Sequence, residues 1–195
     1  MYCRIIDNFL TPEECTKLIE LARPKLEVAT SWDTLNAKRQ ITDYRMSDQM
    51  FFQLGENDLV KKIETKISNI TGLPVENGEG IQILRYGVGG HYKEHADYFD
   101  PAFEGNQIPL KQGGQRLYTV IIYLNDVQKG GWTFFPRTRD MIAPKQGRAL
   151  LFRNVDEQRN PDPDTIHEGQ DVLEGEKWLL SKWIRERTFT YEPQD

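Results

Sequence analysis

Near the N-terminus, apolar residues recur every three or four positions, and this spacing predicts an amphipathic helix. The segment begins at Thr11-Pro12-Glu13-Glu14, which supplies an N-cap, a proline at the first helical position and a capping-box glutamate. The apolar stripe that follows consists of Cys15, Leu18, Ile19 and Ala22. The stripe stops before Pro24, so we expect one short helix with a single buried face.

A second helix is predicted by a longer stripe of the same spacing. Its members are Leu59, Val60, Ile63, Ile67 and Ile70. The stripe ends at Gly72, which can adopt the left-handed cap conformation, and Pro74 prevents the helix from continuing. Residues 30–50, between the two helices, show no clear period, and we expect a mobile loop there.

From Gly80 onward the pattern changes to short apolar or alternating runs separated by Gly, Pro, Asn and Asp, which is typical of strands. The runs are GIQILRYGVGG, RLYTVIIYLNDV, GGWTFFP, GRALLFRN and KWLLSKWIRERTFTY. No helix-length periodic segment separates them, which favours an antiparallel barrel or a double-sheet jelly roll over βαβ units. Phe99 to Gln115 is expected to be a long loop. The fold class is therefore mainly β with N-terminal helices (α+β).

The length of 195 residues suits one domain, with helical support in residues 1–75 and a β core at about 80–191. A net charge of −5 without a Lys/Arg stripe argues against a nucleic-acid partner. No run of apolar residues is long enough for a membrane span, and the N-terminus lacks the pattern of a signal peptide. With only two cysteines, Cys3 and Cys15, we expect a cytoplasmic protein.

Metal chemistry is suggested by the histidines, of which there are three: His91, His95 and His167. In His95-Ala96-Asp97 the two polar side chains would project to the same face of a strand, because strand side chains alternate with period two. If His167 comes alongside, the three form a 2-His-1-carboxylate triad, which leaves positions open at non-heme Fe(II).

A rival motif overlaps this one. Residues 91–95 spell H-x-x-E-H, the inverted zinc-protease pattern, with two histidine ligands and a general-base glutamate. That chemistry requires a helix through these residues, whereas Gly87, Gly89 and Gly90 precede them and a strand-like run leads into them. The iron interpretation is therefore favoured.

The wider pattern resembles the prolyl 4-hydroxylase family of the 2-oxoglutarate/Fe(II)-dependent dioxygenases, and the likeness covers nearly the whole chain. The matching segments are NFLTPEEC, Arg45-Met46-Ser47, LPVENGEGIQILRYGVGGHYKEHADYF, QRLYTVIIYLNDVQKGGWTFFP and HEGQDVLEGEKWLLSKWIRER. The resemblance implies a double-stranded β-helix (a cupin-like jelly roll), and it implies that His95, Asp97 and His167 hold Fe(II).

The resemblance also implies a binding site for 2-oxoglutarate. It assigns Lys177 as the cation that pairs with the distal carboxylate, and it places Tyr86 and Thr133 near the same molecule. A buried ammonium suits a carboxylate and would be costly without one. Period two puts Lys177, Leu179, Ser181, Trp183 and Arg185 on one face of the last strand.

Further positions are implied for the peptide substrate. Tyr92, Arg116 and Trp183 match residues associated with the peptide itself. Arg45, Ser47 and Glu79 match residues near its groove or the loop that covers it. Two positions depart from the family pattern, because Trp132 stands where relatives usually carry an acidic residue and Arg185 replaces a frequent histidine. Both are places where substrate choice could be altered.

The implied activity is hydroxylation of a peptidyl proline at C4, in which 2-oxoglutarate and O2 are cosubstrates, 2-oxoglutarate becomes succinate and CO2, and ascorbate serves as reductant. The implied partner is a proline-containing peptide or protein, bound in an extended or polyproline-II form. Alternatives are the same chemistry on a free amino acid or lysyl side chain, a catalytically silent peptide-binding module, and a zinc hydrolase. The oligomeric state stays open.

Overall fold

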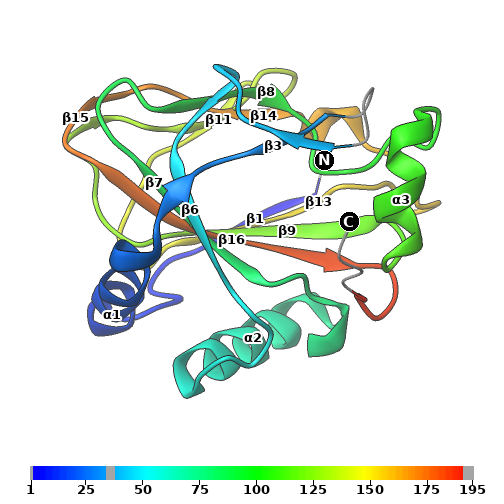
Figure 1. Cartoon of the computed structure of the whole chain (residues 1–195), viewed down its shortest axis with the longest axis horizontal. Coiled ribbons are helices and arrows are strands. Elements are labelled where there is room, and N and C mark those ends of the chain that lie inside the picture. The colour runs from blue at the N-terminus through cyan, green and yellow to red at the C-terminus, as the bar shows by residue number, and fades with distance from the viewer. Residues whose placement is uncertain (1, 34–37, 191–195) are drawn as a thin grey trace.

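In the computed structural model, which describes residues 2–33 and 38–190, seven strands form one antiparallel sheet, the major sheet (Figure 1). Its strands, in spatial order, are β1 (Cys3–Ile6), β13 (Ala149–Arg153), β9 (Arg116–Tyr123), β16 (Lys177–Arg185), β7 (Ile81–Tyr86), β6 (Asp48–Phe52) and β2 (Glu27–Val28). Every residue of β16 is buried, which follows from its central place in the sheet.

A second sheet of five strands, the minor sheet, lies opposite the major sheet (Figure 1). Its order is β12 (Asp140–Ile142), β11 (Thr133–Phe135), β14 (His167–Gly169), β8 (His91–His95) and β5 (Arg45–Met46). Two further pairs are β10 (Lys129–Gly130) with β15 (Val172–Glu174), and β3 (Ser31–Asp33) with β4 (Lys38–Gln40). The expected mainly β fold with two facing antiparallel sheets is confirmed.

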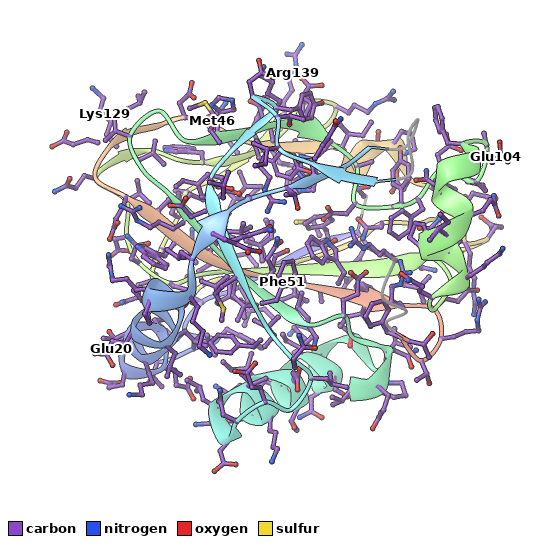
Figure 2. All side chains as sticks on the ribbon, viewed as in Figure 1. Glu20, Met46, Phe51, Glu104, Lys129 and Arg139 are labelled. Atoms are coloured by element: carbon purple, nitrogen blue, oxygen red, sulfur yellow. The ribbon has the colours of Figure 1, made fainter. Side chains whose placement is uncertain are left out.

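The inner strands of the major sheet are buried on both faces, so β9 and β13 contain consecutive apolar residues instead of an alternation of apolar and polar ones. Ile83 and Leu180 face the helices, whereas their neighbours Leu84 and Leu179 face the minor sheet. Side chains fill both spaces, between the two sheets and between the major sheet and the helices (Figure 2). The face toward the minor sheet is the one that carries Lys177 and Trp183.

The predicted helices are present as α1 (Pro12–Ala22) and α2 (Asp58–Thr71), and both cover the outer face of the major sheet (Figure 1). The Thr11 side chain accepts from the Glu14 backbone N–H in the expected capping box. Helix α2 ends at Gly72, whose φ of 70° is the left-handed cap that glycine favours. Among the described residues, no helix is both long and apolar enough to cross a lipid bilayer.

Two expectations about loops were wrong in part. Residues 30–50 contain β3, β4, β5 and the start of β6, although residues 34–37 lie outside the described part. The expected loop 99–115 contains a short helix, α3 (Gln107–Lys111). Strands β5 and β6 pair with β8 and β7, which lie far away in the sequence, and α3 has only five residues, so local periodicity carries no signal for these elements. Short 3₁₀ helices are η1 (Arg23–Lys25), η2 (Val75–Asn77), η3 (Glu104–Asn106) and η4 (Pro163–Thr165).

Candidate functional site

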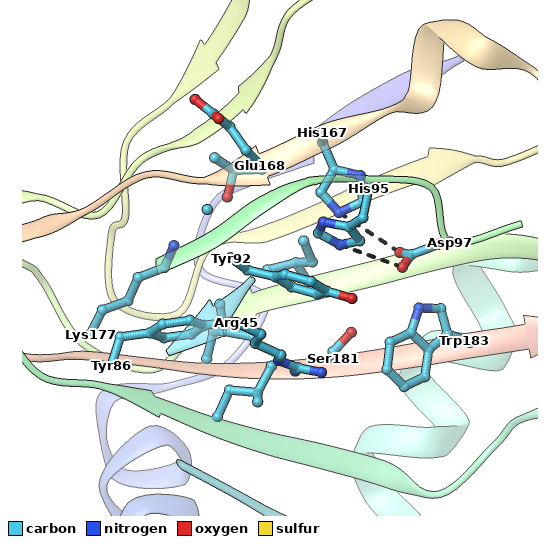
Figure 3. Close-up of a pocket in the computed structure, with 15 residues that line it drawn as sticks. Arg45, Tyr86, Tyr92, His95, Asp97, His167, Glu168, Lys177, Ser181 and Trp183 are labelled. Atoms are coloured by element: carbon cyan, nitrogen blue, oxygen red, sulfur yellow. Dashed lines mark ion pairs between the residues drawn. The ribbon is translucent and has the colours of Figure 1, made fainter. Parts of the chain in front are cut away.

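His95, Asp97 and His167 come together at the inner face of the minor sheet (Figure 3). His95 ends β8 and is the register partner of His167, which begins β14, and Asp97 follows two residues after β8. Asp97 Oδ1 lies 3.8 Å from His95 Nε2, and Asp97 Oδ2 lies 3.9 Å from His167 Nε2. One ligand atom from each residue falls within 4.8 Å of the others, as a shared metal ion requires.

Backbone carbonyls set the tautomers of both histidines. His95 Nδ1 lies 2.8 Å from the carbonyl oxygen of Lys93, and His167 Nδ1 lies 2.9 Å from that of Thr165. Because a carbonyl can only accept, each Nδ1 carries the hydrogen and each Nε2 keeps its lone pair. Both lone pairs therefore belong to the atoms that face Asp97, which is the usual outer-shell arrangement of histidine ligands.

A β-bulge explains why Tyr92 and His95 both face the pocket although they are three residues apart. Along β14 the pairing advances two residues, from His167 to Gly169, while along β8 it advances three, from His95 to Tyr92. The extra residue reverses the side-chain alternation. Tyr92 consequently stacks on His95 with ring centroids 3.5 Å apart.

His91 does not join the cluster. Its Nε2 lies 3.1 Å from the carbonyl oxygen of Asp43, and its Nδ1 lies 3.1 Å from Asp171 Oδ1. Residues 91–95 form a strand, so the helix that the H-x-x-E-H interpretation requires is absent. The zinc-hydrolase alternative is therefore wrong.

The protonation states of this cluster suit metal binding. Burial and the neighbouring His167 lower the pKa of His95 to about 3, so its imidazole is neutral. For Asp97, burial works against ionisation, but His167, His95, Arg116 and the hydrogen bond from Thr119 outweigh it and lower the pKa to about 2. A neutral imidazole and an ionised carboxylate are the forms in which these side chains bind metals.

The residues present fit an Fe(II) ion. Two imidazole nitrogens with free lone pairs and one carboxylate make the donor set of non-heme iron oxygenases, which uses three positions and leaves the others open. The three side chains are buried or nearly so, which excludes bulk water from the centre.

A pocket with about 420 Å³ of empty space, part of it open to solvent, extends from this centre toward Lys177 (Figure 3). Lys177 is only 2% exposed, and its Nζ lies over the rings of Tyr86 and Tyr123, at 5.4 and 5.8 Å from their centroids. Within the described residues, no hydrogen bond or ion pair involves this ammonium, and burial lowers the pKa of Lys177 to about 7. A buried cation without a counter-ion fits the carboxylate of 2-oxoglutarate.

Tyr86 and Thr133 both line the pocket near Lys177. Tyr86 is the register partner of Lys177 across β7 and β16, and it is 4% exposed. Thr133, at the start of β11, accepts a 2.7 Å hydrogen bond from the Tyr123 hydroxyl. Because Thr133 thereby keeps its own hydrogen free, its hydroxyl can donate to an oxygen in the pocket.

The three residues matched to the peptide substrate adjoin the centre on its other side, although only Tyr92 and Trp183 line the pocket. The Arg116 guanidinium lies 4.0 Å from the Trp183 ring centroid and donates to Glu79 through Nε and Nη2, at 2.6 and 2.8 Å. Its Nη1 reaches the Asp97 carbonyl oxygen at 3.4 Å. Arg116 therefore supports the Trp183 ring and the backbone of Asp97 from behind.

The remaining matched positions are divided between the pocket and its surroundings. Arg45 lines the pocket, donates to Gln82 Oε1 at 3.3 Å, and lies over the Tyr92 ring at 4.6 Å. Ser47 is outside the lining, and its hydroxyl oxygen is buried. Trp132 is also outside the lining and is 38% exposed.

Arg185 does not share the pocket face, although period two predicts that it does. The pairing of β16 with β9 shifts between Ile184 and Arg185, and this irregularity breaks the alternation. The Arg185 guanidinium is 1% exposed, donates to the Pro109 carbonyl of α3, and lies 3.6 Å from Glu79 Oε1. It connects α3 to the Glu79–Arg116 pair.

Sequence reasoning did not identify Thr119 and Asn154, which are both fully buried behind Asp97. Thr119 Oγ1 donates to Asp97 Oδ2 at 2.7 Å, and Asn154 Nδ2 donates to Thr119 Oγ1 at 2.8 Å. The available signal was a polar residue at a buried position of an apolar strand run, but threonine is itself a strand former and therefore attracts no notice.

Comparisons with known proteins agree with this geometry. Residues 81–185 match the family model of the 2OG-Fe(II) oxygenase superfamily. The chain is 37% identical to prolyl 4-hydroxylase 2 and 38% identical to prolyl 4-hydroxylase 1 of Arabidopsis thaliana, over 95% and 94% of its length. It spans 67% and 68% of those two relatives.

Solved structures give the same result. The viral collagen prolyl hydroxylase of Paramecium Bursaria Chlorella virus-1, in its 2OG complex, superposes with a TM-score of 0.75 and 31% identity, covering 95% of this chain and 96% of that one. A Pseudomonas putida prolyl-4-hydroxylase shares the fold with a TM-score of 0.62 at 15% identity, covering 94% of this chain and 92% of its own.

Proposed function

Because this chain belongs to the prolyl 4-hydroxylase family of the 2-oxoglutarate/Fe(II)-dependent dioxygenases, we propose that it hydroxylates prolyl residues of a peptide or protein at C4. It is a 2-oxoglutarate-dependent dioxygenase whose cofactor is Fe(II) and whose cosubstrates are 2-oxoglutarate and O2. The observation that carries the proposal is a pocket faced by three side chains able to bind one metal ion and by a buried ammonium that has no partner among the described residues.

In this proposal His95, Asp97 and His167 hold the iron, and Lys177 binds the distal carboxylate of 2-oxoglutarate. Tyr86 and Thr133 orient the same molecule through their hydroxyl groups. When bound, the iron supplies the oxidising chemistry that couples decarboxylation of 2-oxoglutarate to insertion of one oxygen atom into a C–H bond. The buried walls of the pocket exclude water, which protects that chemistry from side reactions.

The substrate peptide is proposed to lie against Tyr92 and Trp183, with Arg116 as their support. The indole of Trp183 is 9% exposed, and its Nε1 has no hydrogen-bond partner among the described residues. A proline-rich peptide in the polyproline-II form offers backbone carbonyls to such a donor and ring faces to the aromatic side chains. The relative from the Chlorella virus is called a collagen prolyl hydroxylase, which supports a peptide acceptor of this kind.

Two further parts of the proposal concern the reductant and the cellular location. Ascorbate is proposed as the reductant that sustains turnover, and repeated cycles that stop without it would support this role. A cytoplasmic location, expected from the low cysteine content, stays a prediction that cell fractionation can check.

The test is reconstitution of the protein with Fe(II) and 2-oxoglutarate under anaerobic conditions, followed by oxygen and a panel of proline-rich peptides. Mass spectrometry reads succinate and peptide hydroxylation together. We expect hydroxyproline to form in step with succinate, and Asp97→Ala to yield neither product, because it removes the anionic ligand. If the product is instead a hydroxylated lysyl residue or a hydroxylated free amino acid, the acceptor is a lysyl side chain or a free amino acid and not a peptidyl proline. A protein that binds iron and 2-oxoglutarate but yields neither product would support the silent module.

A further inference from the structure

Asp97 has two carboxylate oxygens in different surroundings. Oδ2 accepts the 2.7 Å hydrogen bond from Thr119 Oγ1, and within the described residues no hydrogen bond is formed to Oδ1. Thr119 lies on β9 and is the register partner of Trp183 on β16 and of Phe152 on β13. The Thr119 backbone is thus held between two neighbouring strands of the major sheet, and this fixes the position from which its hydroxyl reaches Asp97.

The direction of the hydrogen bonds follows from the chemistry of the groups. The Asp97 carboxylate is ionised and can only accept, so the single hydrogen of the Thr119 hydroxyl points to Oδ2. The Thr119 hydroxyl oxygen can then only accept a hydrogen bond from Asn154, whose amide NH2 group donates to it at 2.8 Å. If the amide were reversed, its oxygen would compete with Asp97 for the same hydrogen.

Asn154 is itself held in place by the backbone. Its N–H donates to the Leu117 carbonyl at 2.9 Å, and its carbonyl accepts from Asp162 N–H at 3.0 Å. The amide oxygen Oδ1 is buried without a hydrogen-bond partner among the described residues. The Asn154 amide therefore donates to Thr119 through its NH2 group while its buried oxygen stays without a hydrogen bond from the described residues. Such an unsatisfied buried oxygen is unfavourable, which indicates that the orientation of the Thr119 hydroxyl matters.

We propose that Thr119, oriented by Asn154, is a positioning residue that holds the Asp97 carboxylate as a one-oxygen metal ligand. The hydrogen bond occupies one lone pair of Oδ2, whereas both lone pairs of Oδ1 stay free of hydrogen bonds from the described residues, so Oδ1 is the better ligand oxygen. The same bond resists a rotation of the carboxylate that would bring both oxygens onto the ion. A carboxylate that bound through both oxygens would occupy a coordination position that 2-oxoglutarate and dioxygen need. This inference rests on the proposed ligand set of His95, Asp97 and His167.

The test compares Thr119→Val with Thr119→Ser. Valine keeps the branched shape and removes the hydroxyl, whereas serine keeps the hydroxyl and removes a methyl group. Metal affinity is measured by anaerobic competition of Fe(II) between each metal-free variant and a chromogenic chelator. We expect Thr119→Val to bind Fe(II) about 10- to 100-fold more weakly, as is usual when an outer-shell partner is lost. Thr119→Ser should stay close to the parent.

A second measurement follows the ratio of succinate formed to peptide hydroxylated. We expect this ratio to rise in Thr119→Val, because a carboxylate that can rotate no longer preserves the open positions. Asn154→Asp, which cannot donate to Thr119 in its ionised form, should shift both quantities in the same direction. If thermal unfolding shows that Thr119→Val does not fold, the Asn154→Asp variant tests the role of the Thr119 hydroxyl instead.

Equal Fe(II) affinity in Thr119→Val and the parent would overturn the inference, and so would equal losses in the valine and serine variants, because then the hydroxyl is irrelevant. Failure of the proposed ligand set looks different. In that case Asp97→Ala would bind Fe(II) as tightly as the parent, whatever the Thr119 variants do.

Discussion

Lys182 Nζ lies 2.8 Å from Glu64 Oε1, and both side chains are only 1% exposed. The pair joins β16 to α2 on the face of the major sheet opposite the pocket. Five residues earlier on the same strand, Lys177 is equally buried but has no counter-ion among the described residues. Two buried lysines on one strand thus differ, because only Lys182 has a counter-ion among the described residues.

Removal of Lys182 should destabilise the protein strongly. Lys182→Met leaves the Glu64 carboxylate buried, and the Gly55 N–H at 3.0 Å is then its remaining donor among the residues that the structure describes. Loss of one partner of a buried ion pair costs about 3–5 kcal/mol of unfolding free energy. Urea denaturation checks this, and the double variant Lys182→Met/Glu64→Gln should recover part of the loss. A single variant as stable as the parent would contradict the prediction.

Lys177→Met should act in the opposite sense on stability. Burial of an unpaired ammonium is unfavourable, so we expect the variant to unfold at higher urea concentration than the parent when 2-oxoglutarate is absent. Its requirement for 2-oxoglutarate should rise by roughly 10- to 100-fold, because one charge-assisted contact contributes about 1.5–3 kcal/mol. Steady-state kinetics at varied 2-oxoglutarate measures this effect. An unchanged requirement would remove Lys177 from the binding site.

The affinity for 2-oxoglutarate should depend on pH through the same residue. The pKa of Lys177 is lowered to about 7 by burial, and a bound carboxylate should raise it. Only the ammonium form attracts the carboxylate, so the dissociation constant should increase above about pH 7, by up to roughly tenfold per pH unit. Calorimetry in buffers of different ionisation enthalpy should show proton uptake on binding. Lys177→Met, the control, should show none from this source.

Substitution of Trp183 should affect the peptide and not 2-oxoglutarate. Trp183→Phe keeps an aromatic ring but loses the Nε1 donor, which has no hydrogen-bond partner in the described part of the chain. The KM for peptide should therefore rise about 2- to 10-fold, the equivalent of one neutral hydrogen bond. Trp178→Phe is the control, because Trp178 lies on the same strand but packs in the core beneath the helices. Equal effects of the two substitutions on the KM for peptide would contradict the assigned role.

Much of the fold was predictable because its signals are local. The capping box at Thr11 and the left-handed glycine at position 72 mark helix ends by backbone hydrogen bonding alone. The runs of consecutive apolar residues in β9 (VIIY) and β13 (ALLF) identify strands that are buried on both faces. Strands β5 and β6 had no such signal, since pairing with β8 and β7 determines them.

The sequence predicted which residues form the candidate site better than it predicted how they are arranged. The motif His95-Ala96-Asp97 identified side chains that do come together with His167, but Asp97 lies beyond the strand and a bulge in β8 determines which residues face inward. Likewise, an irregular pairing removes Arg185 from the face predicted by period two. Such departures depend on distant pairing partners, so alternation counted along one strand cannot reveal them.

The position of β16 has a consequence for folding during synthesis. It is the last strand of the described chain, yet it lies between β9 and β7, which are both made earlier. Until this strand leaves the ribosome, β7 and β9 have no neighbour to fill the gap between them and expose apolar, unpaired edges. The nascent protein should therefore depend on chaperones until its final stage, and Lys177 reaches the pocket only with the strand that closes the sheet.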